Sequence, residues 1–258
     1  MSGTQHDMIT WGMMLRKLPS IVRALPRVVK GLKIANVKQP DQPCGLAFTF
    51  EQATLRNPNG PALLQGTVVL TYTQVNQWAN RIAHHLIAQG IGKGDVVGLF
   101  IENRPELLVS VLAVAKVGAI SAMLNTSQTQ QALLHSVNLV NPAAIVVGAE
   151  LVQAYSAIRQ QVAIEPDRTW WVADPSNPQP LPEGFVDLIS ASVDCPGDNP
   201  PSSQQVYLDD PCFYIYTTGT TGLPKAGVFK HGRWMKSSTS FGMIALDMSP
   251  DDVVYCTL

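Results

Sequence analysis

Apolar and polar positions between residues 62 and 147 alternate between helical and extended spacing. The segment 71–74 (Thr-Tyr-Thr-Gln) has the sequence of a capping box, and the apolar positions after it recur at helical spacing as far as Gly90. A second helix is predicted from 106 to 117, where Gly118 ends it. Both segments are expected to turn an apolar face toward a core.

Three apolar runs, at 95–101, 119–124 and 143–147, lack polar alternation and are predicted to be strands buried on both faces. Between the second and third runs, Ser127 and Gln130 are predicted to cap another helix. A β-α-β-α-β succession implies a mainly parallel sheet with helices on its faces. The fold class is therefore α/β.

The remainder of the chain is less regular. Residues 174–211 are rich in Pro, Ser, Asn and Asp and are predicted to be an irregular connection that carries little core. A helix is expected at 232–246 and the start of a strand at 251–256. The predicted organisation is an N-terminal arm at 1–44, a first α/β unit at 45–173, the connection at 174–211, and the start of a second α/β unit at 212–258.

Charge is distributed unevenly along the 258 residues. Residues 1–40 carry seven basic side chains against Asp7 alone, whereas the remainder carries 11 basic and 18 acidic ones. Because apolar and cationic residues are interleaved at 8–38, we expect peripheral contact with an anionic membrane there. Pro19 and Pro26 are expected to break any single long helix in this arm. The alternative is an N-terminal helix packed on its own domain.

Several other classes are disfavoured. Nucleic acid is a poor partner because the chain beyond the arm is acidic and has no second basic patch. The apolar run 107–124 is divided by Lys116, Gly118 and Ser121 into a helix and a strand, so it is not expected to span a membrane. No secretory signal is evident, and the four cysteines show no paired spacing that would indicate a metal site or a disulfide framework. A cytoplasmic location is expected.

The histidines suggest packing and solvation more than chemistry. His84 and His85 fall on or near the polar side of the helix after residue 71 and are expected to be solvated. His231 is expected to pack at a helix start, where Arg233 and Trp234 could stack. No Ser-His-Asp or paired-carboxylate constellation can be assembled, which argues against a hydrolase.

The chemistry of the chain is concentrated in the segment 214–225, Tyr-Ile-Tyr-Thr-Thr-Gly-Thr-Thr-Gly-Leu-Pro-Lys. Apolar runs at 212–216 and 226–229 predict that this segment is a loop between two strands. Its glycines let backbone N–H groups converge on an anion, its threonines add hydroxyl donors, and its lysine adds a positive charge. The candidate phosphate-binding residues are Thr217, Thr218, Gly219, Thr220, Thr221, Gly222 and Lys225.

Two other interpretations of this segment have to be considered. Gly/Thr-rich segments are common as turns that bind nothing. A Walker loop is excluded, since that loop places Gly directly before Lys-Ser/Thr and opens a helix, whereas Leu223 and Pro224 precede Lys225 and Ala226 follows it. The segment therefore does not indicate a P-loop NTPase.

The full string closely resembles the AMP-binding signature of the adenylate-forming superfamily, Tyr-Thr-Ser-Gly-Thr-Thr-Gly-x-Pro-Lys, with Thr218 in place of the usual serine. The extension 225–234 looks most like the fatty-acid-transport-protein and very-long-chain acyl-CoA synthetase branch. The resemblance runs from about residue 45 to the end and implies the N-terminal part of that superfamily's large domain.

The resemblance also implies an activity. In that family a fatty acid carboxylate attacks ATP with Mg²⁺ present, pyrophosphate leaves, and coenzyme A then displaces AMP from the acyl-adenylate. By matching position, the loop residues would surround the β- and γ-phosphates, with Thr220 and Lys225 as catalytic residues. The family's magnesium-holding Tyr-Gly-x-Thr-Glu segment, adenine pocket, ribose-binding aspartate, hinge and C-terminal domain have no match, so we expect an N-terminal fragment that is inactive alone. The alternatives are a non-catalytic membrane-associated module for fatty-acid uptake or lipid binding, and a non-functional remnant.

Overall fold

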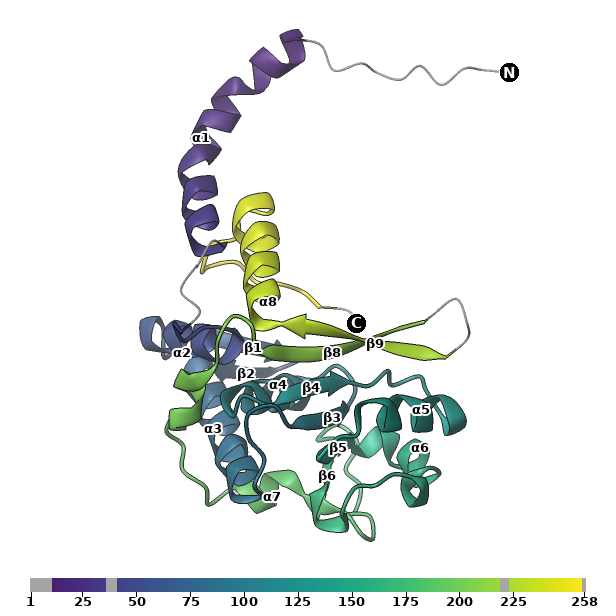
Figure 1. Cartoon of the computed structure of the whole chain (residues 1–258). Coiled ribbons are helices and arrows are strands. Elements are labelled where there is room, and N and C mark those ends of the chain that lie inside the picture. Colours follow the sequence, from purple (N-terminus) through teal and green to yellow (C-terminus); the bar gives the residue numbers. More distant parts are fainter. Residues whose placement is uncertain (1–10, 36–40, 219–222, 257–258) are drawn as a thin grey trace, which may run out of the picture. The chain divides into compact units, whose positions relative to one another are not determined.

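The computed structural model describes residues 11–35, 41–218 and 223–256, and the chain divides into two compact units (Figure 1). The first unit combines the N-terminal helix with residues from 235 onward, and the second runs from residue 39 to 234. The sequence motif lies in the second unit.

The second unit is built around a seven-stranded sheet in the order β7-β6-β5-β3-β4-β8-β9. All neighbouring pairs are parallel except β8 with β9, which are antiparallel. The α/β class with a mainly parallel sheet is therefore confirmed. The strands are β3 (Val96–Phe100), β4 (Ile120–Met123), β5 (Ala144–Gly148), β6 (Thr169–Val172), β7 (Val186–Asp187), β8 (Pro211–Thr218) and β9 (Pro224–Lys230).

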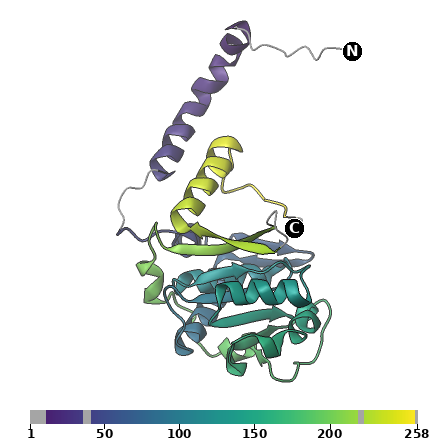
Figure 2. The same ribbon diagram turned by 45° about the vertical axis from the view of Figure 1, so that its right-hand side comes forward.

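Helices cover both faces of this sheet, and each face has its own core (Figure 2). Alternate strand residues point to opposite faces, so Val97 and Val146 pack with one set of helices while Phe100 and Val147 pack with the other. The first core takes α3 (Tyr72–Ala88), α4 (Pro105–Lys116) and α7 (Leu188–Ser192), and the second takes α5 (Gln130–Val140) and α6 (Val152–Ser156).

The best-predicted elements are those with explicit start and stop signals. Thr71 and Gln74 form the capping box of α3 as expected, through both reciprocal hydrogen bonds. Gly118 ends α4 with a φ of +73°, which a residue without Cβ adopts at little cost. The cap predicted for α5 is wrong: Thr129 precedes the helix without a side-chain bond, and Ser127 bonds to Asn125 instead.

The segment 174–211 is irregular, but the expectation that it carries little core is wrong. It contains β7, α7 and the 3-10 turn η4 (Pro201–Gln205). Phe185, Leu188 and Val206 are buried in it. Pro and Asn interrupt secondary structure without preventing single apolar side chains from entering a core formed by other elements.

The remaining elements of the second unit are short. A two-stranded antiparallel hairpin, β1 (Pro61–Gln65) with β2 (Val68–Thr71), precedes α3, and α2 (Leu46–Arg56) packs near α3 and α4. Three single 3-10 turns are η1 (Ala149–Leu151), η2 (Arg159–Gln161) and η3 (Pro166–Arg168). The sequence led us to expect a new unit at 212, whereas β8 and β9 extend the same sheet as β3 and β4. The division of the chain into an arm and two α/β units otherwise stays a prediction.

The first unit pairs α1 (Trp11–Ala35) with the π-helical segment η5 (Thr239–Ala245), which continues from α8 (His231–Ser238). The expectation that Pro19 and Pro26 break the arm is wrong, because α1 is one helix (Figure 1). Each proline removes one backbone hydrogen bond, and prolines seven residues apart lie on the same side of a helix, where they bend it without ending it. The strand expected at 251–256 is also wrong, since this segment is a turn followed by irregular backbone.

Two expectations about side chains are corrected as well. His85 is not solvated: it is buried edge-on against Trp170 at a centroid distance of 5.5 Å, and burial lowers its pKa. Arg233 does not stack on Trp234, because its guanidinium lies 5.0 Å from the Phe229 ring centroid. In both cases the side chain contacts an aromatic ring on a strand: His85 contacts Trp170 on β6, and Arg233 contacts Phe229 on β9.

Candidate functional site: a phosphate hairpin

The predicted loop joins two paired strands. β8 and β9 pair from Pro211 with Lys230 to Thr218 with Pro224, so the segment between Thr218 and Pro224 closes an antiparallel hairpin. The expectation of a loop between two strands is confirmed. Residues 219–222, and with them Gly219, Thr220, Thr221 and Gly222, lie outside the described residues, as does the side chain of Thr218.

The two ends of the hairpin place a hydroxyl beside a cation. Thr217 and Lys225 are direct cross-strand partners, and side chains at directly opposed positions point to the same face of a sheet. Both residues are exposed. Phe213 and Phe229 lie on this same face, with ring centroids 6.4 Å apart, so the aromatic pair supports the strands behind the polar end.

The hairpin lies at the edge of the sheet where ligands of α/β proteins usually bind. β8 runs parallel to β4, with Ser121 opposite Phe213 and Met123 opposite Ile215. The segment after β8 therefore leaves from the same carboxyl edge as those after β3, β4 and β5. Open parallel sheets bind ligands outside the carboxyl ends of their strands.

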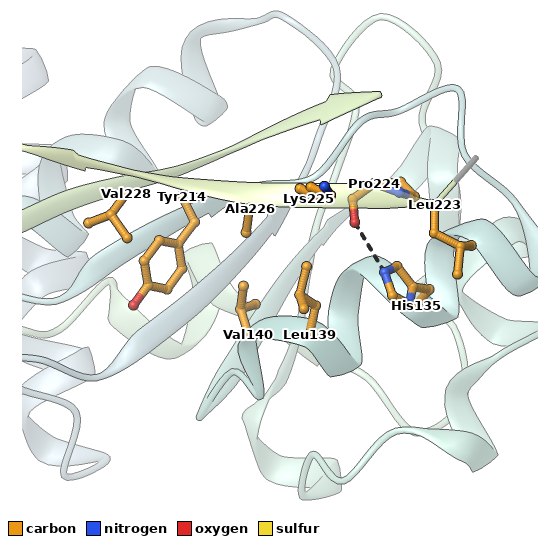
Figure 3. Close-up of a pocket in the computed structure, with 9 residues that line it drawn as sticks. All are labelled: His135, Leu139, Val140, Tyr214, Leu223, Pro224, Lys225, Ala226 and Val228. Atoms are coloured by element: carbon orange, nitrogen blue, oxygen red, sulfur yellow. Dashed lines mark hydrogen bonds between the residues drawn. The ribbon is translucent and has the colours of Figure 1, made fainter. Parts of the chain in front are cut away.

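Helix α5 holds both strands of the hairpin close to the loop (Figure 3). The Tyr216 hydroxyl donates to the Ser136 carbonyl oxygen at 2.8 Å, two residues before the end of β8. The His135 ring Nε2 lies 3.1 Å from the carbonyl oxygen of Pro224, the first residue of β9, and donates a hydrogen bond when Nε2 carries the proton. Neighbouring residues of one helix thus fix the two strands between which the loop closes.

A hollow of about 570 Å³ lies between α5 and the hairpin, and Figure 3 shows its walls. Leu139, Val140, Ala226 and Val228 make it largely apolar, while Tyr214 and Pro224 line its strand side. Tyr214 and Val228 are cross-strand partners, as are Thr218 and Pro224, so these residues lie on the face opposite Thr217 and Lys225. Lys225 also lines the hollow, so the hollow reaches the cation at the loop end of the hairpin, although Thr217 and Lys225 are paired on the other face of the strands.

The charges around the hairpin suit an anion. Within 11–35, 41–218 and 223–256, no ion pair involves Lys225, whereas Lys230 on the same strand pairs with Asp209 at 3.1 Å. Burial raises the pKa of the Cys212 thiol at the start of β8 to about 12, which keeps it neutral. An exposed lysine that lies across the strands from a threonine and forms no ion pair with a described carboxylate fits a polyphosphate group.

His231 packs as expected at the end of β9. It is fully buried, its Nδ1 accepts a 3.4 Å hydrogen bond from the Leu46 N–H, and a Cβ at Gly45 would collide with that nitrogen. Burial lowers its pKa to about 4. Gly45 has a φ of +97°, which favours glycine, and the absence of a Cβ at this position leaves room for the His231 ring.

No cluster of three or more His, Cys, Asp and Glu side chains suited to a metal ion occurs in the described part of the chain. Among the predicted residues, the structure brings together Thr217 and Lys225. His135, Ser136 and Tyr216 were missed, and only the aromatic character of β8 could have suggested that one of them matters.

Proteins of known family resemble this chain. The family model described as AMP-binding enzyme matches residues 50–258. The medium/long-chain-fatty-acid–CoA ligase FadD6 of Mycobacterium tuberculosis is 31% identical, over 99% of this chain and 41% of the relative. Long-chain fatty acid transport protein 6 of Mus musculus is 34% identical, over 81% of this chain and 33% of the relative. The chain therefore spans about two fifths or less of these curated relatives.

Solved structures share the fold. The inhibitor-bound N-terminal domain of FACL13 from Mycobacterium tuberculosis aligns with a TM-score of 0.61 at 27% identity, covering 73% of this chain and 44% of that one. The anthranilate CoA ligase AuaEII in complex with anthranoyl-AMP aligns with a TM-score of 0.69 at 24% identity, covering 79% of this chain and 38% of that one. At this identity the second likeness concerns the fold alone.

Proposed function

This chain belongs to the AMP-binding enzyme family, and from that premise we propose that it is the N-terminal part of an AMP-forming ligase that joins long-chain or very-long-chain fatty acids to coenzyme A. Its curated relatives at about 30% identity are fatty acid–CoA ligases and fatty acid transport proteins. The observation that carries the proposal is the hairpin itself, where Thr217 lies opposite Lys225 at the carboxyl edge of the sheet and Lys225 has no ion-pair partner among the described residues.

The proposed reaction consumes ATP, a fatty acid and coenzyme A, and releases AMP and pyrophosphate. Thr217, Thr218, Gly219, Thr220, Thr221, Gly222 and Lys225 are proposed to surround the β- and γ-phosphates, with Thr220 and Lys225 acting on the leaving pyrophosphate. Negative charge builds up on that group as the carboxylate attacks, and fixed donors stabilise it there. Magnesium, when bound with ATP, would neutralise more of this charge.

The hairpin suits this role because its parts are held before ligand arrives. Tyr216 and Pro224 are bonded to α5, so the threonine and lysine at the ends of the loop are positioned by the sheet and not by the nucleotide. Preorganised donors stabilise a transition state more than donors that must be ordered on binding. We expect this chain alone to hold nucleotide phosphate without forming the thioester.

The test begins with the reading frame. The encoding transcript is sequenced past codon 258, and any longer product is assayed for palmitoyl-CoA formed from palmitate, MgATP and coenzyme A. The proposal predicts that the reading frame continues and that its product forms palmitoyl-CoA. Lys225→Ala should lower that activity at least about 100-fold, because it removes a charged contact to the transition state. A stop codon directly after Leu258, or an active product indifferent to Lys225→Ala, would overturn it.

A non-catalytic function is the second candidate, because the N-terminal helix has an exposed apolar face. Residues 8–38 are proposed to make peripheral contact with an anionic membrane, on the cytoplasmic side where ATP and coenzyme A are available. No described helix combines the length and apolar character needed to cross a bilayer. If the catalytic proposal failed, a lipid-binding or fatty-acid-uptake module would remain to be tested through this helix.

A further inference from the structure

The N-terminal helix has two different faces, and only one is used within its unit. Gly31 is buried against η5, where an added Cβ would lie 2.6 Å from the Ile244 side chain. Arg27, one turn earlier, forms an ion pair with Asp247. Residues four apart lie on the same side of a helix, so Arg27 and Gly31 define the face that packs on η5.

The opposite face is apolar and exposed. At about 100° per residue, the positions roughly half a turn away from Arg27 and Gly31 form one continuous line. We call this line the apolar stripe; its members are Trp11, Leu15, Leu18, Val22, Leu25 and Val29. Their exposed fractions run from 44% for Val29 to 81% for Trp11. Within its own unit, α1 therefore leaves this stripe uncovered.

The charges of α1 indicate what could cover the stripe. Between Trp11 and Ala35 the helix carries six basic residues and no acidic one. One of the six, Arg27, is paired with Asp247. At the same rotation per residue, Lys33 falls within the stripe, Lys30 and Arg23 lie about 100° and about 120° from its centre, and Arg16 lies nearer the Arg27–Gly31 face. A protein partner would need a long apolar groove bordered by acidic side chains. An anionic bilayer offers an apolar acyl region and negatively charged headgroups along the whole length of the helix.

We propose that the apolar stripe of α1 inserts into the surface of an anionic lipid bilayer while the Arg27–Gly31 face stays packed on η5. This specifies the peripheral contact suggested above by naming the inserted side chains and the required lipid charge. It does not depend on the ligase activity. The stripe enters the acyl boundary, and Lys33 and Lys30 extend toward the headgroups with their aliphatic stems against the bilayer. The helix lies in the interface and does not cross it.

The test is co-sedimentation of the full 258-residue chain with large vesicles. Vesicles of phosphatidylcholine and phosphatidylserine (7:3) are compared with phosphatidylcholine alone, and wild type is compared with Leu18→Glu/Val22→Glu. The matched control is Val68→Glu/Val69→Glu, which adds the same charge at two exposed apolar positions on β2. We expect at least tenfold weaker binding for the stripe variant, unchanged binding for the control, and at least tenfold weaker binding of wild type to neutral vesicles.

Tryptophan depth gives an independent readout. Trp11 is 81% exposed, whereas Trp78 and Trp234 are half-buried and Trp170 and Trp171 are buried. Quenching by brominated lipid should appear with wild type and be lost in Trp11→Phe, while unchanged thermal melting shows that each variant is folded. Equal vesicle binding by wild type and Leu18→Glu/Val22→Glu, or no binding by wild type, would overturn the proposal. A dimer in light scattering that the stripe variant abolishes, without vesicle binding, would assign the stripe to a second copy instead.

Discussion

Thr217 and Lys225 are placed by residues outside the recognisable motif. Their strands are tied to α5 through Tyr216 on one side and Pro224 on the other. Glycine loses more conformational freedom than other residues when its backbone is fixed, so binding through a glycine-rich sequence costs conformational entropy. Anchors at both of its ends reduce the freedom that binding has to remove.

These anchors make a first prediction. Tyr216→Phe and His135→Ala each remove one hydrogen bond of about 1 kcal/mol, so amide hydrogen exchange in 217–226 should accelerate about fivefold in either variant. Tyr214→Phe is the matched control, because the described residues offer no hydrogen bond to the Tyr214 hydroxyl. Exchange equally slow in wild type and both anchor variants would show that α5 does not hold the hairpin.

A second prediction concerns acid. The pKa of His231 is lowered by burial to about 4, against about 6.5 for an unfolded histidine. Between pH 6.5 and pH 4, His231 is protonated in the unfolded chain and neutral in the folded chain. Protonation therefore favours the unfolded state, so the contribution of neutral His231 to the free energy of unfolding is complete above pH 6.5 and is lost as the pH falls toward 4. The free energy of unfolding should fall by about 3 kcal/mol through His231. The lowered pKa of His85 should reduce the free energy of unfolding further, by a smaller amount.

Urea unfolding between pH 7 and pH 4 measures this effect. His231→Asn should be less stable at pH 7 and show a flatter dependence on pH, whereas the control His84→Asn should keep the wild-type slope. Lys93 and Asp210 are the charges near His231, and they form a 2.6 Å ion pair with each other. If the free energy of unfolding depended on pH as steeply in His231→Asn as in wild type, His231 would not be the source of the pH dependence.

Helices and strands could be predicted from the sequence where the residues that determine them are close together along the chain. The capping box of α3, the glycine after α4 and the apolar strands were predicted because each depends on residues a few positions apart. The burial of His85 and the stacking of Arg233 on Phe229 depend on partners that the chain brings together only on folding. Periodicity carries no information about such contacts.

One contact between elements was not predictable from sequence and gives a third prediction. Lys116 on α4 and Glu51 on α2 are fully buried, with Nζ and Oε1 2.6 Å apart. Burial lowers the pKa of Lys116 even though Glu51 opposes this. Asn199 accepts from Lys116 at 3.1 Å, and Ser203 donates to Glu51 at 3.3 Å, so the pair also fastens the connection before β8.

Removing one partner leaves a buried charge alone. Lys116→Met and Glu51→Leu should each lower the free energy of unfolding by about 3–5 kcal/mol, whereas the double variant should recover most of that loss because no charge is left buried. Urea unfolding of the four proteins gives the coupling free energy directly. Additive losses in the double variant would show that the two side chains do not depend on each other.

For the whole molecule, the fold and the family could be predicted from sequence, and the placement of the motif largely could not. The α/β class follows from alternating periodicity, and the resemblance of 214–225 agrees with the family match over 50–258. That the hairpin extends the existing sheet follows from pairing between β4 and β8, which are distant in sequence. That α1 continues past Pro19 and Pro26 is a difference from the expectation based on proline alone, since prolines on one side of a helix bend it without ending it.

The most direct test of the central claim is MgATP binding to the 258-residue chain, measured by titration calorimetry for wild type, Lys225→Ala and Lys230→Ala. Lys230 is the matched control, a cation on the same strand that is paired with Asp209. The account predicts saturable binding by wild type, a loss of about tenfold to 100-fold for Lys225→Ala, the value of one charge-assisted contact, and little change for Lys230→Ala. Equal affinity of wild type and Lys225→Ala, or no binding by wild type, would contradict the assignment of a nucleotide-phosphate site to this hairpin.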